Sequence, residues 1–336
     1  VRQIATSKLV ALNDARSISL SGYLDSIKQD LKTVSTSPTT LDAVRSFSNS
    51  WHGVPGDKTA TLQKAYIEDN PNPLGQKENL DFAPDSSFYS SVHGKYHPWF
   101  RTFLRERGYY DIFLFDLDGN LIYSVFKEAD YATNLNTGPW KDSDLGNVFR
   151  AARAGTSADS VSFFDFKPYA PSADAPASFI GSPIFADDGQ MAGILVFQMP
   201  IDRINEVMHV ESGMGETGET ILVGDDGLLR SDSRFHAGES ILKIKLENEA
   251  VTRAFAGENG IVEALNEDKH LALTAFRPFE FEGTNWALIA QQDKDEVFTG
   301  LTTLRNDILM WSGGILLLMT VLGLLAGRSV SRPITA

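Results

Sequence analysis

Aromatic side chains gather in the first half of the chain, and one carboxylate stands among them. The residues that could form a binding site there are Trp99, Tyr110, Tyr131, Trp140, Phe163, Asp165 and Tyr169. Aromatic faces attract cations, and a carboxylate opposes the same positive charge. This mix predicts a cage for a small quaternary ammonium or zwitterionic solute, with Asp165 facing its positive end. The alternative is that the aromatic rings fill a hydrophobic core and Asp165 caps a turn.

No pattern in the sequence is typical of an enzyme or of a resident metal or cofactor. The chain lacks a G-x-S-x-G motif, a Walker loop and an H-E-x-x-H motif. Its cysteine count is 0, which excludes disulfides, thiolate catalysis and cysteine-bound zinc. We therefore expect neither a catalytic residue nor a metal nor a cofactor.

Two glycine-containing motifs resemble binding loops but stand in the wrong context. In "DLDGN", residues 116–120, Gly119 is fourth, whereas a calcium loop needs glycine at its sixth position. "GMGETG", residues 213–218, has dinucleotide-type spacing, but a helical stretch precedes it and a strand follows. We interpret the first motif as a hairpin turn and the second as a flexible join between two modules.

The charge of the chain argues against a nucleic-acid partner. Its formal net charge is -14 at pH 7. Binding to phosphate backbones depends on clustered Lys and Arg, which release counterions. We therefore expect no DNA or RNA partner.

Residues 308–326 are predicted to cross a membrane. These 19 residues carry no charge, and about 20 apolar residues span a bilayer. Arg328 and Arg332 follow the span, whereas acidic residues dominate positions 293–307 before it. The positive-inside rule then places residues 1–305 in the periplasm of a bacterial cell and the C-terminus in the cytoplasm. We also expect an earlier span upstream of the first residue.

A long helix is predicted at the N-terminus. Apolar residues recur at heptad spacing from Leu20 to Val34, and "STSPTT" ends the pattern at Pro38. This seam can pack against a second copy or against the chain's own modules, and our prediction is a parallel dimer of first helices. A second helical stretch is predicted at Leu41–Phe47.

One pattern of predicted strands occurs twice. "DIFLFDLDGNLIYSVF" and "TILVGDDGLLRSDS" each place Asp-Gly between apolar runs, which is typical of a β-hairpin. Each is followed by a helix-compatible stretch and three further strands, at 160–200 in the first copy and 260–293 in the second. The sequence therefore predicts an α+β fold: a long N-terminal helix, two tandem PAS-like antiparallel sheets and one transmembrane helix.

Taken together, the chain resembles the sensor region of a bacterial double-Cache chemoreceptor. The features that carry the resemblance are the long first helix, "YYDIFLFDLDGNLIYSVFKEADYATNL", "GMGETGETILVGDDGLLRSD", the final span and "RSVSRPI". The resemblance implies an inner-membrane homodimer, a periplasmic ligand pocket in the membrane-distal module and a cytoplasmic signalling domain after Ala336. The expected parts are residues 1–50 for the N-terminal helices, 51–210 for the distal module, 211–300 for the proximal module, 308–326 for the span and 327–336 for the start of a HAMP linker.

The resemblance is incomplete where the ligand is chosen. Amino-acid-binding members carry Arg-x-Trp-Tyr, but here "GPWK" keeps Trp140 and has Gly138 and Lys141 at the outer positions. We therefore expect a cationic or betaine-like ligand. An amino acid is an alternative, and a dicarboxylate bound near Arg101 and Arg150 is another.

The output of the receptor is also open. We expect chemotaxis, with a histidine kinase or a nucleotide cyclase as alternatives within the same family. A membrane-tethered enzyme, or an adhesion protein without a ligand, would belong to different classes.

Overall fold

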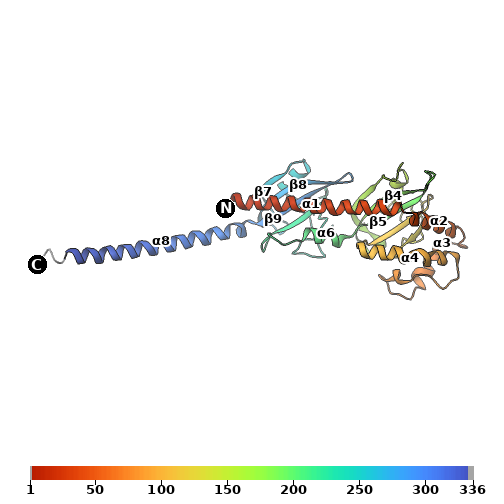
Figure 1. The fold of residues 1–336 in the computed structure, drawn as a ribbon, viewed down its shortest axis with the longest axis horizontal. Coiled ribbons are helices and arrows are strands. Elements are labelled where there is room, and N and C mark those ends of the chain that lie inside the picture. The colour runs from red at the N-terminus through yellow and green to blue at the C-terminus, as the bar shows by residue number, and fades with distance from the viewer. Residues whose placement is uncertain (1, 332–336) are drawn as a thin grey trace.

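Two antiparallel sheets lie one after the other along a single long helix, and a second long helix projects from the end (Figure 1). This computed structural model describes residues 2–331, with side chains described for 3–298 and 308–325. The first long helix is α1 (Arg2–Ser35) and the projecting helix is α8 (Lys294–Ser331). The predicted fold class, including its two sheets and terminal helices, is confirmed.

The break between the first two helices follows from local sequence. Helix α2 (Pro38–His52) has Pro38 in its first turn, where proline has no hydrogen bond to lose. The Ser37 side chain caps it by accepting a hydrogen bond from the Thr39 N–H. The predicted stop of the first helix before Pro38 is therefore confirmed.

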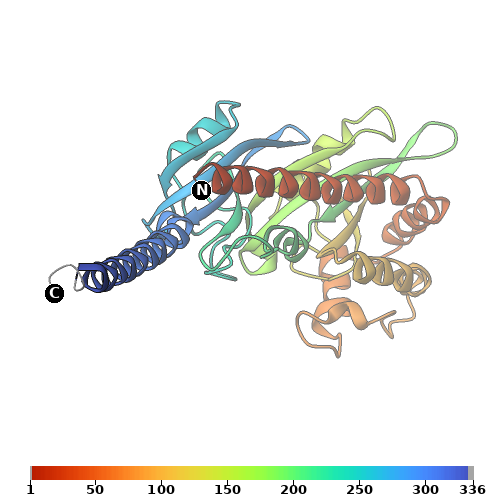
Figure 2. The ribbon, with the colours of Figure 1, turned by 60° about the vertical axis from the view of Figure 1, so that its left-hand side comes forward.

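The heptad seam of α1 packs within the chain. Its residues Leu20, Leu24, Ile27, Leu31 and Val34 are at most 2% exposed. They belong to one hydrophobic core that contains strand residues of both sheets, and the ribbon of α1 runs along both sheets (Figure 2). Of the two expected uses of the seam, packing against the chain's own modules is the one observed. Our prediction that the seam pairs with a second copy is wrong, because its side chains are already buried.

The first sheet, in the module expected to be membrane-distal, has five strands in the order β2-β1-β5-β4-β3, all antiparallel. One face packs against α1, α2 and α4 (Phe88–Arg107), and the other packs against α5 (Asp144–Arg153). The strands are β1 (Asp111–Phe115), β2 (Leu121–Ser124), β3 (Ser162–Tyr169), β4 (Ala175–Phe185) and β5 (Met191–Gln198).

The second sheet repeats this plan with four strands in the order β6-β9-β8-β7. Its outer face packs against α7 (Glu249–Phe255). The strands are β6 (Glu219–Val223), β7 (Gly260–Leu265), β8 (Leu271–Phe281) and β9 (Thr284–Asp293).

The hairpin predicted in the second copy is only half formed. After the turn at Gly227 the chain makes a single bridge, Leu229 to Val223, in place of a strand. The Leu229 N–H donates to the Ile244 carbonyl, and the Leu246 N–H donates to the Gly227 carbonyl. The segment around residue 245 thus provides partners for this arm, and no ladder with β6 develops.

The rest of the described chain is short helices and loops. Strand β9 runs into α8 without a loop, so α8 continues directly from the second sheet. The remaining helical elements are α3 (Lys58–Gln63), a π-helical turn (Lys64–Glu68), 3-10 turns (Lys77–Asn79 and Ala170–Ser172) and α6 (Ile201–Met208).

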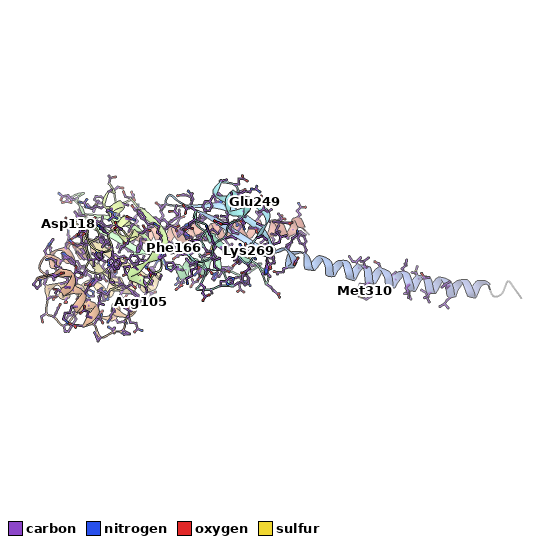
Figure 3. All side chains as sticks on the ribbon, turned by 180° about the vertical axis from the view of Figure 1, so that it is seen from behind. Arg105, Asp118, Phe166, Glu249, Lys269 and Met310 are labelled. Atoms are coloured by element: carbon purple, nitrogen blue, oxygen red, sulfur yellow. The ribbon has the colours of Figure 1, made fainter. Side chains whose placement is uncertain are left out.

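Helix α8 contains the one candidate membrane span found among the described residues. Residues Ile308–Leu325 have a mean hydropathy of 2.2 and are not buried by any other element. Met310, near the start of this stretch, is exposed and lies on the part of α8 that extends beyond the two sheets (Figure 3). Of the expected HAMP linker, residues 332–336 lie outside the described residues.

Candidate functional site

A cavity of about 270 Å³ lies in the distal module where α5 faces β3 and β4. Ser143 lines this cavity and caps the start of α5, since its hydroxyl accepts a hydrogen bond from the Gly146 N–H. The lining residues that argue for a binding role are Trp140, Asp142, Asp144, Asn147, Lys167 and Tyr169.

Charges of both signs meet in this cavity. The Lys167 ammonium lies 3.0 Å from Asp144 Oδ2, and the Asn147 amide donates to Asp144 Oδ1 at 2.8 Å. Lys167 is largely exposed whereas Asp144 is buried, so the lysine can leave the pair and Asp144 cannot. Asp142 adds a second carboxylate at the rim. The arrangement can therefore hold an ammonium group and a carboxylate at once.

Two of the predicted site residues, Trp140 and Tyr169, line this cavity. The indole N–H of Trp140 donates to the Ala129 carbonyl at 3.2 Å. The Tyr169 hydroxyl donates to Asp130 Oδ2 at 2.7 Å. Burial raises the pKa of Asp130 to about 7, and the bond from Tyr169 lowers it in part. Both rings are thus fixed by segment 128–131 behind the cavity.

Tyr110 is held by the same segment but faces a different cavity. Its hydroxyl donates to Glu128 Oε1 at 2.8 Å, and its ring stacks on Phe126 at 5.1 Å. With Phe126 and Gln198 it lines a cavity of about 360 Å³ beside the start of α6. The structure therefore does not bring Tyr110 into the cavity of Trp140.

Tyr131 belongs to an aromatic cage that the chain itself fills. The Lys127 ammonium lies 4.7, 5.1 and 5.8 Å from the ring centres of Tyr123, Tyr131 and Tyr66. Lys127 is fully buried, and burial lowers its pKa to about 7 although the charge of Asp111 acts in the opposite direction. Tyr131 therefore contacts a side chain of this protein, and its predicted role in binding a ligand stays a prediction.

Trp99 lies apart from every other predicted site residue. It is on α4, 40% exposed, and stacks on Phe103 at 5.6 Å. It lines neither of the two cavities of the distal module described above.

Asp165 and Phe163 lie at the junction of the two modules. Asp165 accepts hydrogen bonds from Arg230 Nε at 2.8 Å and from the Trp286 indole at 3.0 Å. Phe163 packs edge-to-face on Phe281 and Trp286. The structure thus corrects the expected position of Asp165: β3 is irregular between Phe164 and Lys167, and the carboxylate contacts the second sheet and does not line the cavity.

The basic residues named as an alternative site have local partners. Arg101 is paired with Asp81 at 2.6 Å and donates to the Glu78 carbonyl. Arg150 donates to the Leu135 and Lys141 carbonyls. Both guanidinium groups therefore stabilise loops of the distal module.

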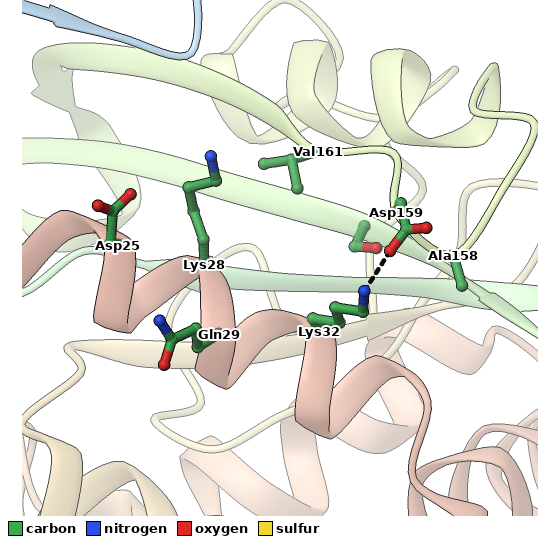
Figure 4. Close-up of a pocket in the computed structure, with 8 residues that line it drawn as sticks. Asp25, Lys28, Gln29, Lys32, Ala158, Asp159 and Val161 are labelled. Atoms are coloured by element: carbon green, nitrogen blue, oxygen red, sulfur yellow. Dashed lines mark ion pairs between the residues drawn. The ribbon is translucent and has the colours of Figure 1, made fainter.

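A further groove of about 340 Å³ follows α1 beside β4 (Figure 4). Lys32 crosses it to pair with Asp159 at 2.5 Å. One turn earlier, Lys28 pairs with Glu282 of the second sheet at 2.5 Å. Two successive lysines thus fasten α1 to both modules.

Sequence reasoning missed Lys167, Asp144 and Asn147. Lys167 follows Asp165 by two positions on the same strand, so an alternating pattern would place both on one face. The irregular register of β3 breaks that alternation. The bulge carries no clear sequence signal, which explains why the aromatic cluster alone did not identify the cavity.

The fold and the site together define a class of protein: two stacked antiparallel-sheet modules, one with a cavity for a small solute, joined to a helix long and apolar enough to cross a membrane. Comparison with known families agrees. A family model for the Cache domain (dCache_1) matches residues 10–301. The chain therefore belongs to the Cache domain family, as its sequence resemblance implies.

Individual relatives are distant. The chain is 24% identical over 261 residues to "Probable chemoreceptor y4sI" of Sinorhizobium fredii, covering 77% of this chain and 32% of that protein. The chain thus spans about a third of the length of this curated relative.

Two solved structures share the fold. A domain of a sensory box/GGDEF family protein from Vibrio parahaemolyticus aligns with a TM-score of 0.53 at 13% identity, covering 87% of this chain and 97% of that one. The extracellular domain described as that of histidine kinase vpHK1S-Z8 aligns with a TM-score of 0.50 at 12% identity, covering 92% and 99%.

Proposed function

We propose that this chain is the ligand-sensing region of a transmembrane chemotaxis receptor. It binds a small zwitterionic or quaternary ammonium solute in the cavity between α5, β3 and β4. The observation that carries the proposal is that this one cavity combines aromatic rings, among them Trp140 and Tyr169, with Asp144 and Lys167. Ligand cavities for drug-sized molecules start at about 300 Å³, so about 270 Å³ suits a smaller solute.

Each lining residue has a role in this proposal. Trp140 and Tyr169 contact the positive end of the solute through their ring faces. Asp144, with Asp142 at the rim, opposes the ammonium charge. Lys167 turns from Asp144 to the carboxylate of a betaine or an amino acid. The solute thus breaks the ion pair between Lys167 and Asp144 and forms one ion pair with each of these residues.

The experiment is a calorimetric titration of the detergent-solubilised chain with glycine betaine, choline, standard amino acids and dicarboxylates. Betaine or an amino acid is expected to bind. Binding by choline alone would mean that Lys167 has no role in recognition. If only dicarboxylates bind, the proposed ligand class is wrong.

The proposal includes topology and output. Residues 1–305 lie in the periplasm of a bacterial cell, α8 crosses the inner membrane, and a homodimer signals through a cytoplasmic domain without enzymatic activity in this region. A histidine kinase or a cyclase output is the second candidate, because the two solved structures of similar fold come from such proteins. Alkaline phosphatase fused after residue 336 should be inactive, and an active fusion would reverse the orientation.

A further inference from the structure

The loop Gly213–Gly218 encloses the side chain of Glu296, in the first turn of α8. The Glu216 N–H donates to Glu296 Oε1 and the Thr217 N–H donates to Oε2, both at 2.9 Å. The Thr217 hydroxyl donates to Oε2 as well, and it accepts a hydrogen bond from the Asp293 N–H at 3.1 Å. Both carboxylate oxygens are therefore bound by one short loop.

One glycine of the loop, Gly215, is required by this contact. Gly215 has φ +71°, and a Cβ added to it would overlap Glu296 Oε1. Gly213 also has a positive φ, +83°, but a Cβ there would make ordinary contacts with Leu12 and Lys8 of α1, at 3.4 and 3.7 Å, and none with Glu296. The loop thus uses one glycine for the turn and another to let the carboxylate approach the backbone.

The carboxylate is held in its charged form. Partial burial raises the pKa of Glu296, but the hydrogen bonds from Thr217 and Glu216 outweigh burial and lower it to about 2. At any physiological pH the loop therefore faces an anion.

Two neighbours of Glu296 bind elsewhere. The Lys294 ammonium pairs with Glu263 of β7 at 2.7 Å, and Val297 packs in the small core around Leu9 of α1. Glu296 itself binds the connection between α6 and β6, and that connection is the chain's covalent route from the distal module.

We propose that Glu296 and the loop Gly213–Gly218 form a clasp that holds the start of the membrane helix to the connection descending from the distal module. A movement of α6 relative to the second sheet would pull on this loop and so on the first turn of α8. The clasp is a conformational device in which two backbone N–H groups and a hydroxyl bind one carboxylate. It rests on the proposed function only in assigning α8 the role of signal carrier.

The first test measures the clasp itself by amide hydrogen exchange of the chain in lipid nanodiscs, without ligand. Glu296→Ala should speed exchange at the Glu216 and Thr217 amides about ten-fold or more, because both lose their acceptor. Gly215→Ala should do the same, whereas Gly213→Ala carries the same backbone strain and should not. Unchanged exchange at residues 216 and 217 in Glu296→Ala would overturn the clasp.

The second test asks whether the clasp holds the helix. The chain has no cysteine, so spin labels at Phe235→Cys and Ile308→Cys, both exposed positions, can report one distance. We expect a broader or shifted distance distribution in Glu296→Ala and Gly215→Ala, and an unchanged one in Gly213→Ala. An identical distribution in all variants would overturn the mechanical role. Neither measurement involves a ligand, so failure of the proposed ligand leaves both results interpretable.

Discussion

Two tryptophans of the distal module have the same chemistry but face different surroundings. Trp140 lines the charged cavity, whereas Trp99 lies on the outer side of α4 and stacks on Phe103. A ring face contributes about 0.5–2 kcal/mol to cation binding. Trp140→Ala should therefore weaken betaine binding by about 2- to 30-fold in calorimetric titration.

Trp99→Ala is the matched control for this experiment, because it removes an equal ring from the same module. Its affinity should equal that of the unchanged chain. Equal losses in the two variants would mean that the effect is on folding and not on the cavity.

A carboxyl pair in the second module makes stability depend on pH. Burial raises the pKa of Glu267, and the hydrogen bond and charge of Glu219 raise it further, to about 8. A Gln291 amide contacts both carboxyl groups, at 2.6 and 2.9 Å. The folded chain therefore keeps a proton that the unfolded chain releases near pH 4.5.

Since the folded pKa is raised, the contribution of Glu267 to stability is complete below about pH 4.5 and declines as the pH rises to about 8. The slope is at most about 1.4 kcal/mol per pH unit. Glu267→Gln should remove this decline in urea unfolding measured from pH 5 to 9. Glu247→Gln, at an exposed ion pair, should keep it, and parallel curves for all three chains would contradict the shifted pKa.

The residue types of the site were predictable from sequence, but their partners were not. The sequence predicted an aromatic cage for a ligand beside Asp165, whereas the rings around Lys127 form a different cage that shares only Tyr131 with the predicted residues. Lys127 adopts a positive φ of 63°, which folds its side chain back into the ring cluster. A single lysine after Phe126 does not indicate a positive φ. The sequence therefore did not predict that the Lys127 side chain would occupy a group of aromatic rings.

At the level of elements, the repeated strand order was predictable because each strand is a run of apolar and β-branched residues between turn residues. The confirmed examples include β7, β8 and β9, which are the three strands predicted within residues 260–293. The failed hairpin arm after Gly227 and the bulge in β3 were not predictable. The arm after Gly227 bonds to residues 244 and 246, and Asp165 in the bulge bonds to Arg230 and Trp286, so both features involve partners distant in sequence.

The junction between the sheets depends on the bulged part of β3. Arg230 is 4% exposed and holds Asp165 on one side and Asp226 on the other. Asp165→Asn removes one of the two charges that neutralise this buried guanidinium, and Arg230 keeps Asp226. We expect a loss of about 1–3 kcal/mol in the free energy of unfolding.

Asp159→Asn is the control for this change, because its ion pair with Lys32 is exposed on both sides. It should alter stability by less than about 0.5 kcal/mol. Asp165→Asn should also leave betaine affinity unchanged. A ten-fold loss of affinity without a loss of stability would restore Asp165 as a ligand contact.

At the scale of the whole molecule, α1 packs against both modules and joins their hydrophobic cores. Its heptad seam was predictable from apolar spacing, since any long amphipathic helix must bury that stripe. Spacing alone does not say what covers the stripe. Here both sheets cover it, because the two modules follow the helix in the chain and present apolar faces to it.

A homodimer of this chain would therefore have to use the opposite side of α1. The outward positions Ala15, Ile18, Gly22, Asp25 and Gln29 repeat every three to four residues and are exposed. Ile18 is 73% exposed, although it is apolar. Three of them, Ala15, Ile18 and Gly22, are small or apolar and would allow two helices to approach closely at this point.

Single cysteines along α1 of the membrane-embedded receptor test this arrangement, and the chain has no native cysteine to interfere. Cysteines at Ala15, Ile18 and Gly22 should crosslink between copies under mild oxidation. Cysteines at Leu20 and Leu24 should not, because the sheets of their own chain bury them. The reverse pattern would mean that both modules separate from the buried face of α1 when the receptor is embedded in a membrane. If no position crosslinks, α1 is not part of the dimer interface. Two α1 helices in contact would bring at least one of the facing positions close to its copy in the partner.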